Sequence, residues 1–148
     1  MIALVQRVGR ASVVIEGEPV GTIGRGILVL LGVHREDAPE QLEWLVRKCA
    51  NLRIFPDDEG KMNRSVVDVA GDALVVSQFT LYGSVERGNR PSFVESAPPD
   101  VAEPLYERFA SRMSELLGRP VATGRFGAMM DVELVNEGPV TIWIERAP

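Results

Sequence analysis

The N-terminal residues alternate apolar runs with glycine-containing turns: MIALVQRVGRASVVIEGEPVGTIGRGILVLLGV (residues 1–33). Short strands separated by such turns are typical of antiparallel sheets and barrels. Strands are expected over residues 2–8, 11–15, 20–23 and 27–33, with a break near Gly9 and turns at 16–19 and 24–26. This part of the chain therefore predicts a β-rich region whose strands pair antiparallel.

Two helices are predicted in the remainder of the chain. The first begins near Asp37, because Asp37 and Glu40 have the spacing of a capping box. The second runs from about Asp100 to Leu117 and ends at Gly118. The apolar residues at helical spacing are Leu42, Leu45, Val46 and Cys49 in the first helix, and Leu105, Phe109, Met113 and Leu116 in the second.

The order of elements predicts the fold class. Further strands are expected over residues 52–55, 73–81, 129–135 and 140–144. A block of strands separates the two helices, which disfavours repeated βαβ units and a parallel sheet. The predicted class is therefore α+β, an antiparallel, barrel-like sheet with two main helices. A chain of 148 residues is expected to form one domain, residues 1–148.

Composition narrows the class of protein. Apolar residues make up 45% and charged residues 25%, the mixture of a soluble globular protein. The sequence predicts neither a membrane span nor a signal peptide, and Cys49 is the only cysteine, so no internal disulfide can form. With one histidine, one cysteine and no clustered carboxylates, we expect no metal site and no cofactor. A cytoplasmic location is expected.

The net charge of −5 argues against a protein that coats nucleic acid along its backbone. It is compatible with recognition of one end of an RNA. Arg87, Arg90, Arg119 and Arg125 lie near the motifs described below and form either a local basic rim or scattered surface arginines; charge alone favours the second. A Ser-His-Asp triad would require His34, which we expect to be a solvated or hydrogen-bonded surface residue.

The hexapeptide NEGPVT (residues 136–141) lies between two predicted strands and breaks the rules for strands. Proline cannot donate to a sheet ladder, and glycine weakens a strand through backbone entropy. Two interpretations fit. Gly138 and Pro139 form a hairpin turn, or they form a rigid backbone element directed at a ligand. The bond between them can be cis, as X-Pro bonds sometimes are.

The heptapeptide SQFTLYG (residues 77–83) follows a run that is apolar on both faces and therefore predicts a central, buried strand. In a continuing strand, Gln78 and Thr80 share one face, while Ser77 and Phe79 share the other. These polar groups either bond to neighbouring backbone or form a cluster that binds a carbonyl or positions a water. A hydroxyl nucleophile normally needs a base, and none is local, so no covalent triad is expected.

Together, SQFTLY (77–82) and NEGPVT (136–141) resemble the two signature motifs of the D-aminoacyl-tRNA deacylases. Each motif alone is a weak signal, and the resemblance rests on their order along a chain of the family's length. The other segments that resemble the family are MIALVQRV (1–8), NLRIF (51–55), KMN (61–63), RPSF (90–93) and TGRFGAMM (123–130).

The resemblance implies hydrolysis of the ester between a D-amino acid and the 3′-terminal adenosine of a tRNA. It also implies a homodimer with its sites at the subunit interface and no membrane partner. Gly138 and Pro139 would form a cis pair that one subunit lends to the other subunit's site. Their carbonyls would exclude the side chain of an L-amino acid. Such a gate cannot reject glycine, so glycyl-tRNA is an expected second substrate.

The resemblance also assigns residues to the reaction. Ser77, Gln78, Phe79 and Thr80 would surround the scissile ester. The Gln78 amide and the backbone N–H near Phe79 would bind the carbonyl in an oxyanion hole. Thr80 is expected to position groups rather than to attack, with the 2′-hydroxyl of the substrate assisting a water molecule.

Three further residues match the family. Arg7 would brace the cis pair, although a strand-end surface arginine is the alternative. Phe126 and Met129 would receive the terminal adenosine, since an aromatic ring and a methionine can pack on a base; core packing is the alternative. Two other functions remain open: an editing hydrolase of the same fold for glycyl- or L-aminoacyl-tRNA, and a non-enzymatic, β-rich module that binds RNA ends.

Overall fold

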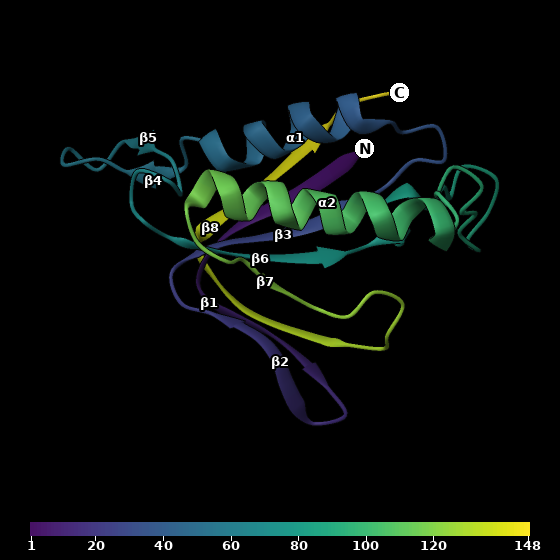
Figure 1. The fold of residues 1–148 in the computed structure, drawn as a ribbon, viewed down its shortest axis with the longest axis horizontal. Coiled ribbons are helices and arrows are strands. Elements are labelled where there is room, and N and C mark those ends of the chain that lie inside the picture. The colour runs from purple at the N-terminus through teal and green to yellow at the C-terminus, as the bar shows by residue number, and fades with distance from the viewer.

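A mixed six-stranded sheet forms the centre of the fold, and two helices lie across it (Figure 1). The computed structural model describes all of residues 1–148. The sheet order is β2-β1-β3-β6-β7, with β8 on the other edge of β1. The elements are β1 (Ile2–Ile15), β2 (Glu18–Ile23), β3 (Gly26–Gly32), α1 (Pro39–Asn51), β4 (Phe55–Pro56), β5 (Met62–Arg64), β6 (Asp72–Ser77), the 3-10 helix η1 (Phe79–Tyr82), α2 (Pro99–Leu117), β7 (Ala122–Thr123) and β8 (Asp131–Glu145).

The long strand β1 organises the sheet because three other strands pair with it antiparallel. Its first half pairs with β3, starting from Ile2 opposite Gly32, and its second half pairs with β2. Strand β8 pairs along the opposite edge of both halves. The chain therefore does not break near Gly9 as predicted. Strand β2 curls back to contact β6 and β7, so the sheet is barrel-like, and the predicted α+β class is confirmed.

The expectation of a wholly antiparallel sheet is wrong. Strand β6 pairs parallel with β3 on one side and with β7 on the other. Helix α1 lies between β3 and β6 in the chain, and α2 lies between β6 and β7, so both helices belong to βαβ units. The small β4–β5 sheet is inserted before β6, so the sequence pattern does not show β3, α1 and β6 as one βαβ unit. Because β3 and β6 are parallel, their carboxyl ends, Gly32 and Ser77, lie at the same edge of the sheet (Figure 1).

Several predicted elements have different bounds. Of the strand predicted over residues 52–55, only Phe55 belongs to β4. The strand predicted over 73–81 ends at Ser77, where the chain turns into η1. The two strands predicted around the Gly-Pro pair are one strand, β8. Helix α2 agrees with its prediction to within one residue, and Gly118 ends it with φ of 74°.

Helix α1 starts with Ala38 as its N-cap residue, and the capping box predicted at Asp37 is wrong. The side-chain oxygen of Gln41 instead accepts a hydrogen bond from the Ala38 N–H at 2.9 Å. The buried Asp37 carboxylate accepts from the amino group of Met1 at 2.8 Å and from the His34 N–H at 2.7 Å. These bonds hold the loop after β3 against the start of β1.

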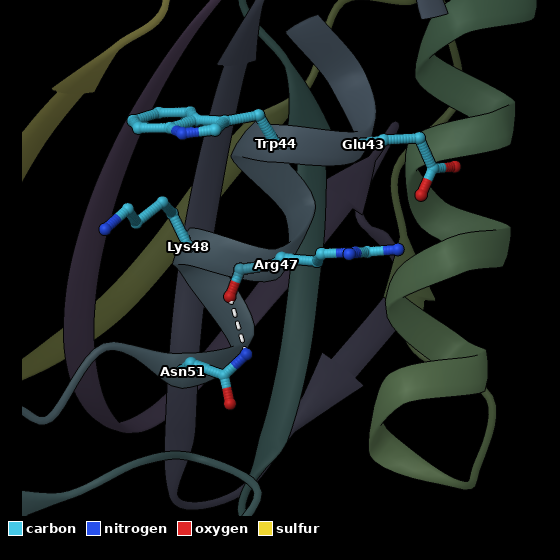
Figure 2. A pocket seen from close by; sticks show the side chains of 5 residues that line it. All are labelled: Glu43, Trp44, Arg47, Lys48 and Asn51. Atoms are coloured by element: carbon cyan, nitrogen blue, oxygen red, sulfur yellow. Dashed lines mark hydrogen bonds between the residues drawn. The ribbon is translucent and has the colours of Figure 1, made fainter. Parts of the chain in front are cut away.

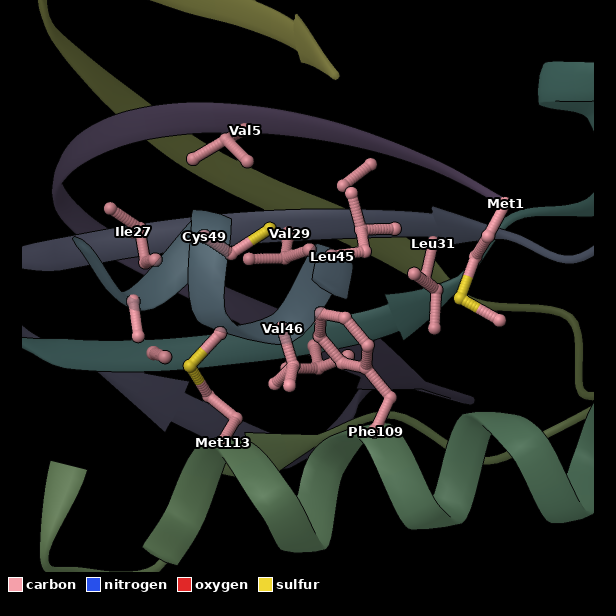
Figure 3. Packing of buried hydrophobic residues seen from close by; sticks show 14 of the residues in the cluster. Met1, Val5, Ile27, Val29, Leu31, Leu45, Val46, Cys49, Phe109 and Met113 are labelled. Atoms are coloured by element: carbon pink, nitrogen blue, oxygen red, sulfur yellow. The ribbon is translucent and has the colours of Figure 1, made fainter. Parts of the chain in front are cut away.

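The main core lies between the sheet and the two helices and contains 23 buried residues (Figure 3). Phe109 and Met113 of α2 point at Val46 of α1 and at the strands beneath it. Phe109 is fully buried, so its truncation to alanine is expected to destabilise the fold by about 3–5 kcal/mol. Cys49 lies in this core as predicted, and burial raises the pKa of its thiol to about 12. Neither helix is both long enough and apolar enough to cross a membrane.

Candidate active site

A cavity of about 650 Å³ opens at the carboxyl ends of β3 and β6. Open α/β sheets bind ligands in this position, outside the carboxyl ends of parallel strands. The N-terminal end of α2 and the loop before β8 complete its wall. The cavity is lined by Val33, Val76, Ser77, Gln78, Phe79, Thr80, Ala97, Pro99, Ala102, Phe126, Gly127, Ala128, Met129, Met130 and Val132. The fold therefore brings all four predicted ester-binding residues together with both residues predicted to receive the adenosine.

The polar residues of the cavity come from the turn between β6 and η1. The Gln78 N–H donates to the Leu31 carbonyl at 2.8 Å, after which the chain leaves the sheet. The prediction that Gln78 and Thr80 share one strand face is wrong, because Thr80 lies in η1. The two side chains meet nevertheless, since the Gln78 amide donates to the Thr80 hydroxyl. This bond fixes the orientation of the amide at the cavity wall.

The wall is open to solvent rather than packed into the core. The Phe79 side chain is 54% exposed, and Thr80 is also exposed. Ser77 and Gln78 are half-buried. Met129, in the loop before β8, is 92% exposed, which contradicts core packing for that residue. Accessible hydroxyl and amide groups beside apolar surface are typical of ligand sites.

Phe126 has two environments. One part of its ring packs beside Tyr106 of α2, with 5.9 Å between ring centroids. The rest lines the cavity. Burial raises the pKa of the Tyr106 hydroxyl, which donates to the Val75 carbonyl at 2.9 Å. Tyr106 therefore links α2 to the strand that leads into the site and supports Phe126 from behind.

His34 does not line the cavity. Its Nε2 lies 2.7 Å from Glu95 Oε2, and its Nδ1 accepts from the Glu36 N–H at 3.1 Å. The ring also meets Tyr82 edge-on at 5.3 Å. The histidine is hydrogen-bonded as predicted, but it is buried rather than exposed at the surface. Because both ring nitrogens have partners, His34 is not placed to act as a base for Thr80.

The Gly-Pro pair forms a bulge in β8. Gln6 of β1 lies opposite Thr141, and Val8 lies opposite Asn136, so residues 137–140 bulge opposite Arg7 alone. The hairpin interpretation is wrong, because both halves of β8 run antiparallel to the same strand. The Asn136 side chain replaces lost ladder bonds by accepting from the Val140 N–H at 2.7 Å and donating to the Val140 carbonyl at 3.0 Å.

The backbone at the bulge requires glycine. The Gly138–Pro139 peptide bond is cis, and Gly138 has φ of 151°. A Cβ atom on Gly138 would lie 2.8 Å from both the N and the Cγ2 atoms of Val140. Because real Cβ atoms do not approach other atoms so closely, an alanine at this position would force the bulge to move.

Arg7 holds the bulge in place. Its Nε donates to the Glu137 carbonyl at 2.8 Å, and its Nη1 donates to the Ile54 carbonyl at 2.6 Å. The side chain is therefore a half-buried connection between β8 and the chain before β4, and not a free surface arginine. Arg7, Gly138 and Pro139 do not line the cavity of their own chain, and Gly138 and Pro139 are exposed.

A second hollow of about 500 Å³ lies on the outward face of α1 (Figure 2). It is lined by Glu43, Trp44, Arg47, Lys48 and Asn51. Lys48 and Arg146 lie over the Trp44 ring, and Glu43 pairs with Arg112 of α2 at 3.0 Å. The hollow contains no hydroxyl side chain. No group of three or more His, Cys, Asp or Glu side chains gathers anywhere in the chain to hold a metal ion.

Residues 4–145 match the family model described as D-Tyr-tRNA(Tyr) deacylase. The chain is 59% identical over 146 residues to a D-aminoacyl-tRNA deacylase of Salinibacter ruber, and the alignment covers 99% of the chain and 97% of the relative. The chain belongs to this deacylase family. A D-aminoacyl-tRNA deacylase of Opitutus terrae is 58% identical over 98% of the chain and 97% of that relative. The family expectation from the sequence is confirmed.

The same fold is found among solved structures. One described as the c-Myc DNA unwinding element binding protein superposes with a TM-score of 0.93 at 45% identity, covering all of both chains. The deacylase family consists of enzymes, so the chain is placed among hydrolases. Sequence reasoning missed the apolar wall formed by Ala97, Pro99 and Ala102 at the start of α2. The Pro98-Pro99 pair, which marks where that helix begins, was the available signal.

Proposed function

We propose that this chain hydrolyses the ester bond of D-aminoacyl-tRNA and releases the tRNA and the free D-amino acid. The observation that carries this proposal is the cavity that joins Ser77–Thr80 to Phe126 and Met129, in a chain of the deacylase family. The first set offers polar groups for an ester. The second offers apolar surface for the adenine of the terminal nucleotide.

The ester is bound by donors that are already oriented. The Gln78 amide, held by its bond to Thr80, and the backbone N–H of Phe79 donate to the carbonyl oxygen as negative charge develops on it. One donor of this kind typically contributes about 10²–10³-fold to the rate. Thr80 acts by positioning, because no base lies beside its hydroxyl. Ser77, which also lines the cavity, is one of the residues that surround the ester.

The reaction uses water. The water oxygen bonds to the carbonyl carbon, and the bond from that carbon to the 3′ oxygen of the ribose breaks. One proton of the water reaches the 3′ oxygen, and the products are the amino acid and a free 3′-hydroxyl. The neighbouring 2′-hydroxyl of the substrate orients the water, in place of a protein base.

Selection for the D configuration comes from a second copy of the chain. Gly138 and Pro139 are exposed and lie outside their own cavity, so they are free to enter a partner's site. The free edge of β8 supports a second copy, because a long unpaired strand edge is normally covered. Trp143 on the same strand is 51% exposed. In the homodimer, the bulge carbonyls occupy the space that an L side chain requires.

The gate discriminates by the configuration at Cα and not by the identity of the side chain. Many D-amino acids therefore pass, and glycine passes because it has no side chain. Glycyl-tRNA is accordingly a second proposed substrate. Both substrates are part of translation, which agrees with the expected cytoplasmic location.

The proposal is tested with three substrates: D-Tyr-tRNA, L-Tyr-tRNA and glycyl-tRNA. We expect rapid release of D-tyrosine and glycine and negligible release of L-tyrosine. Equal rates for the D and L esters would contradict the gate and favour a general editing hydrolase. Binding of all three substrates without hydrolysis of any would contradict the enzymatic proposal and favour an RNA-end binding module.

A further inference from the structure

Residues 83–97 form an arm between η1 and α2. Its two sides are joined by backbone hydrogen bonds between Ser84 and Ser92, at 2.8 and 2.9 Å. The tip, residues 85–91, projects beyond this bridge, and every residue in it is exposed. Gly88 at the tip has φ of 154°, a conformation that favours glycine. The arm is therefore a short, pinned hairpin and not a loose connection.

The base of the arm is attached to the cavity wall. The Phe93 ring meets the Phe79 ring at a centroid distance of 5.0 Å and an angle of 66°. The Ser96 hydroxyl donates to the Phe79 carbonyl at 2.8 Å. Glu95 binds His34, which anchors the same side of the arm to the loop after β3. Because Phe79 lines the cavity, these contacts hold the arm at the mouth of the site.

The side chains that the arm presents are cationic and apolar. Arg87 and Arg90 are exposed, and neither has a carboxylate within 4.0 Å. Phe93, three residues after Arg90 on the same arm, is 36% exposed. In a chain with a net charge of −5, an arm that carries two unpaired arginines and an exposed aromatic ring is suited to an anionic, base-bearing ligand.

We propose that residues 83–97 bind the unpaired nucleotides that precede the terminal adenosine of the tRNA. Phe93 stacks on a base, while Arg87 and Arg90 contact the phosphates. Proteins bind single-stranded RNA through this combination of aromatic rings and cations. The inference rests on the proposed function, because an adenosine seated against Phe126 and Met129 leaves the preceding nucleotides at the mouth where the arm lies.

The first test compares two substrates that differ only beyond the adenosine. Wild-type protein and the Arg87→Ala/Arg90→Ala variant act on D-Tyr-tRNA and on the 3′-D-tyrosyl ester of adenosine. We expect KM for the tRNA to rise about tenfold or more, because phosphate contacts dominate affinity. The rate on the adenosine ester should stay within about twofold, as surface substitutions normally do. Arg47→Ala on α1, also exposed and unpaired, is the matched control and should change neither substrate.

Salt dependence adds a readout that a structural role for the arginines would not change. The slope of log affinity against log salt, measured with a short single-stranded RNA ending in CCA, should fall by about 1.4 in the double variant, since two phosphate contacts to a single strand are lost. Phe93→Leu keeps an apolar side chain against Phe79 and removes the stacking surface. It should weaken binding of this RNA about fivefold or more and leave the salt slope unchanged.

The outcomes distinguish a failure of the arm proposal from a failure of the proposed function. If wild-type protein hydrolyses neither ester, the proposed function fails. Binding of the CCA-ending RNA still tests whether the arm binds RNA. Equal RNA affinity for wild type and the double variant would overturn the proposal that the arm binds RNA. So would an equal loss on both esters, which would indicate damage to the cavity. A change in oligomeric state caused by the double variant would assign the arm to contacts between copies of the chain.

Discussion

In two regions of the molecule a strand is interrupted, and the two interruptions have different structural results. At residues 77–80 the central strand β6 stops and the chain enters η1, which turns polar side chains into a cavity of the same chain. At residues 137–140 the edge strand β8 continues past a bulge that does not line that cavity. The first interruption contributes polar residues to a cavity of its own chain, whereas the second leaves Gly138 and Pro139 exposed outside that cavity.

The two regions are also held differently. The wall is held by two side-chain hydrogen bonds: the Gln78 amide donates to the Thr80 hydroxyl, and the Ser96 hydroxyl donates to the Phe79 carbonyl. The bulge is held by Arg7, whose guanidinium bonds connect it to Ile54. The proposed function therefore assigns the chemistry and the stereochemical selection to two separately held regions. Substitutions in one region should therefore leave the property of the other intact.

The largest effect is expected at the wall. Gln78→Ala removes a donor to the carbonyl oxygen. The single-turnover rate constant for hydrolysis of D-Tyr-tRNA should therefore fall about 10²–10³-fold. The preference for D over L should persist in the residual activity, because the bulge is unchanged. A residual activity that no longer distinguishes D from L would show that the two regions are not separate.

The next effect is on stability and arises at the bulge. Arg7→Ala leaves the carbonyls of Glu137 and Ile54 without their charged donor, so the free energy of unfolding should fall by about 2 kcal/mol. Urea unfolding measures this change. Arg10→Ala, an exposed position on the same strand, is the control and should stay within about 0.5 kcal/mol. An equal loss in the two variants would contradict the bracing role.

A smaller effect is expected on selectivity. Gly138→Ala places a Cβ 2.8 Å from Val140 atoms and displaces the bulge, so the ratio of D to L hydrolysis should fall about tenfold or more. Gly60→Ala is the control, because Gly60 also has positive φ but no atom lies near its Cβ position. If both variants keep the wild-type ratio, Gly138 is not part of a gate.

The smallest effect is expected where the arm meets the wall. Ser96→Ala removes the hydrogen bond to the Phe79 carbonyl, which is worth about 0.5–1.5 kcal/mol. We expect a loss in kcat of about threefold, the lower end of that range, because the bond is exposed. Ser96→Thr keeps a hydroxyl donor and should recover most of the rate. No recovery by threonine would indicate a steric rather than a hydrogen-bonding role.

The sequence predicted the motifs and most of the elements that carry the two regions, but not how these elements are arranged. The two motifs, the two helices and the antiparallel pairing of β1 with β2 and β3 follow from local patterns of apolar residues and turns. The parallel pairing of β6 with β3 does not, because it depends on a contact across α1 and the β4–β5 insertion. Without that pairing, the sequence could not place Val33 beside Ser77 at one cavity.

The details of the two interruptions also needed the structure. The apolar run that starts at Ala73 predicted a strand through Leu81, and no local residue marks its end at Ser77. At the bulge, Gly138 and Pro139 signalled an interruption. They could not distinguish a hairpin from a bulge, because that depends on whether β1 pairs with both flanks. The role of Arg7 depended in turn on that pairing.

In the proposed dimer, the wall of one copy works with the bulge of the other copy. A mixed dimer tests this arrangement; it is formed from a Gln78→Ala chain and a Gly138→Ala chain with different affinity tags and isolated through both. Its only site with an intact Gln78 faces the intact Gly138 of the other chain. We predict that this dimer hydrolyses D-Tyr-tRNA and spares L-Tyr-tRNA as the wild type does. A D-to-L ratio equal to that of the Gly138→Ala protein alone would contradict the claim.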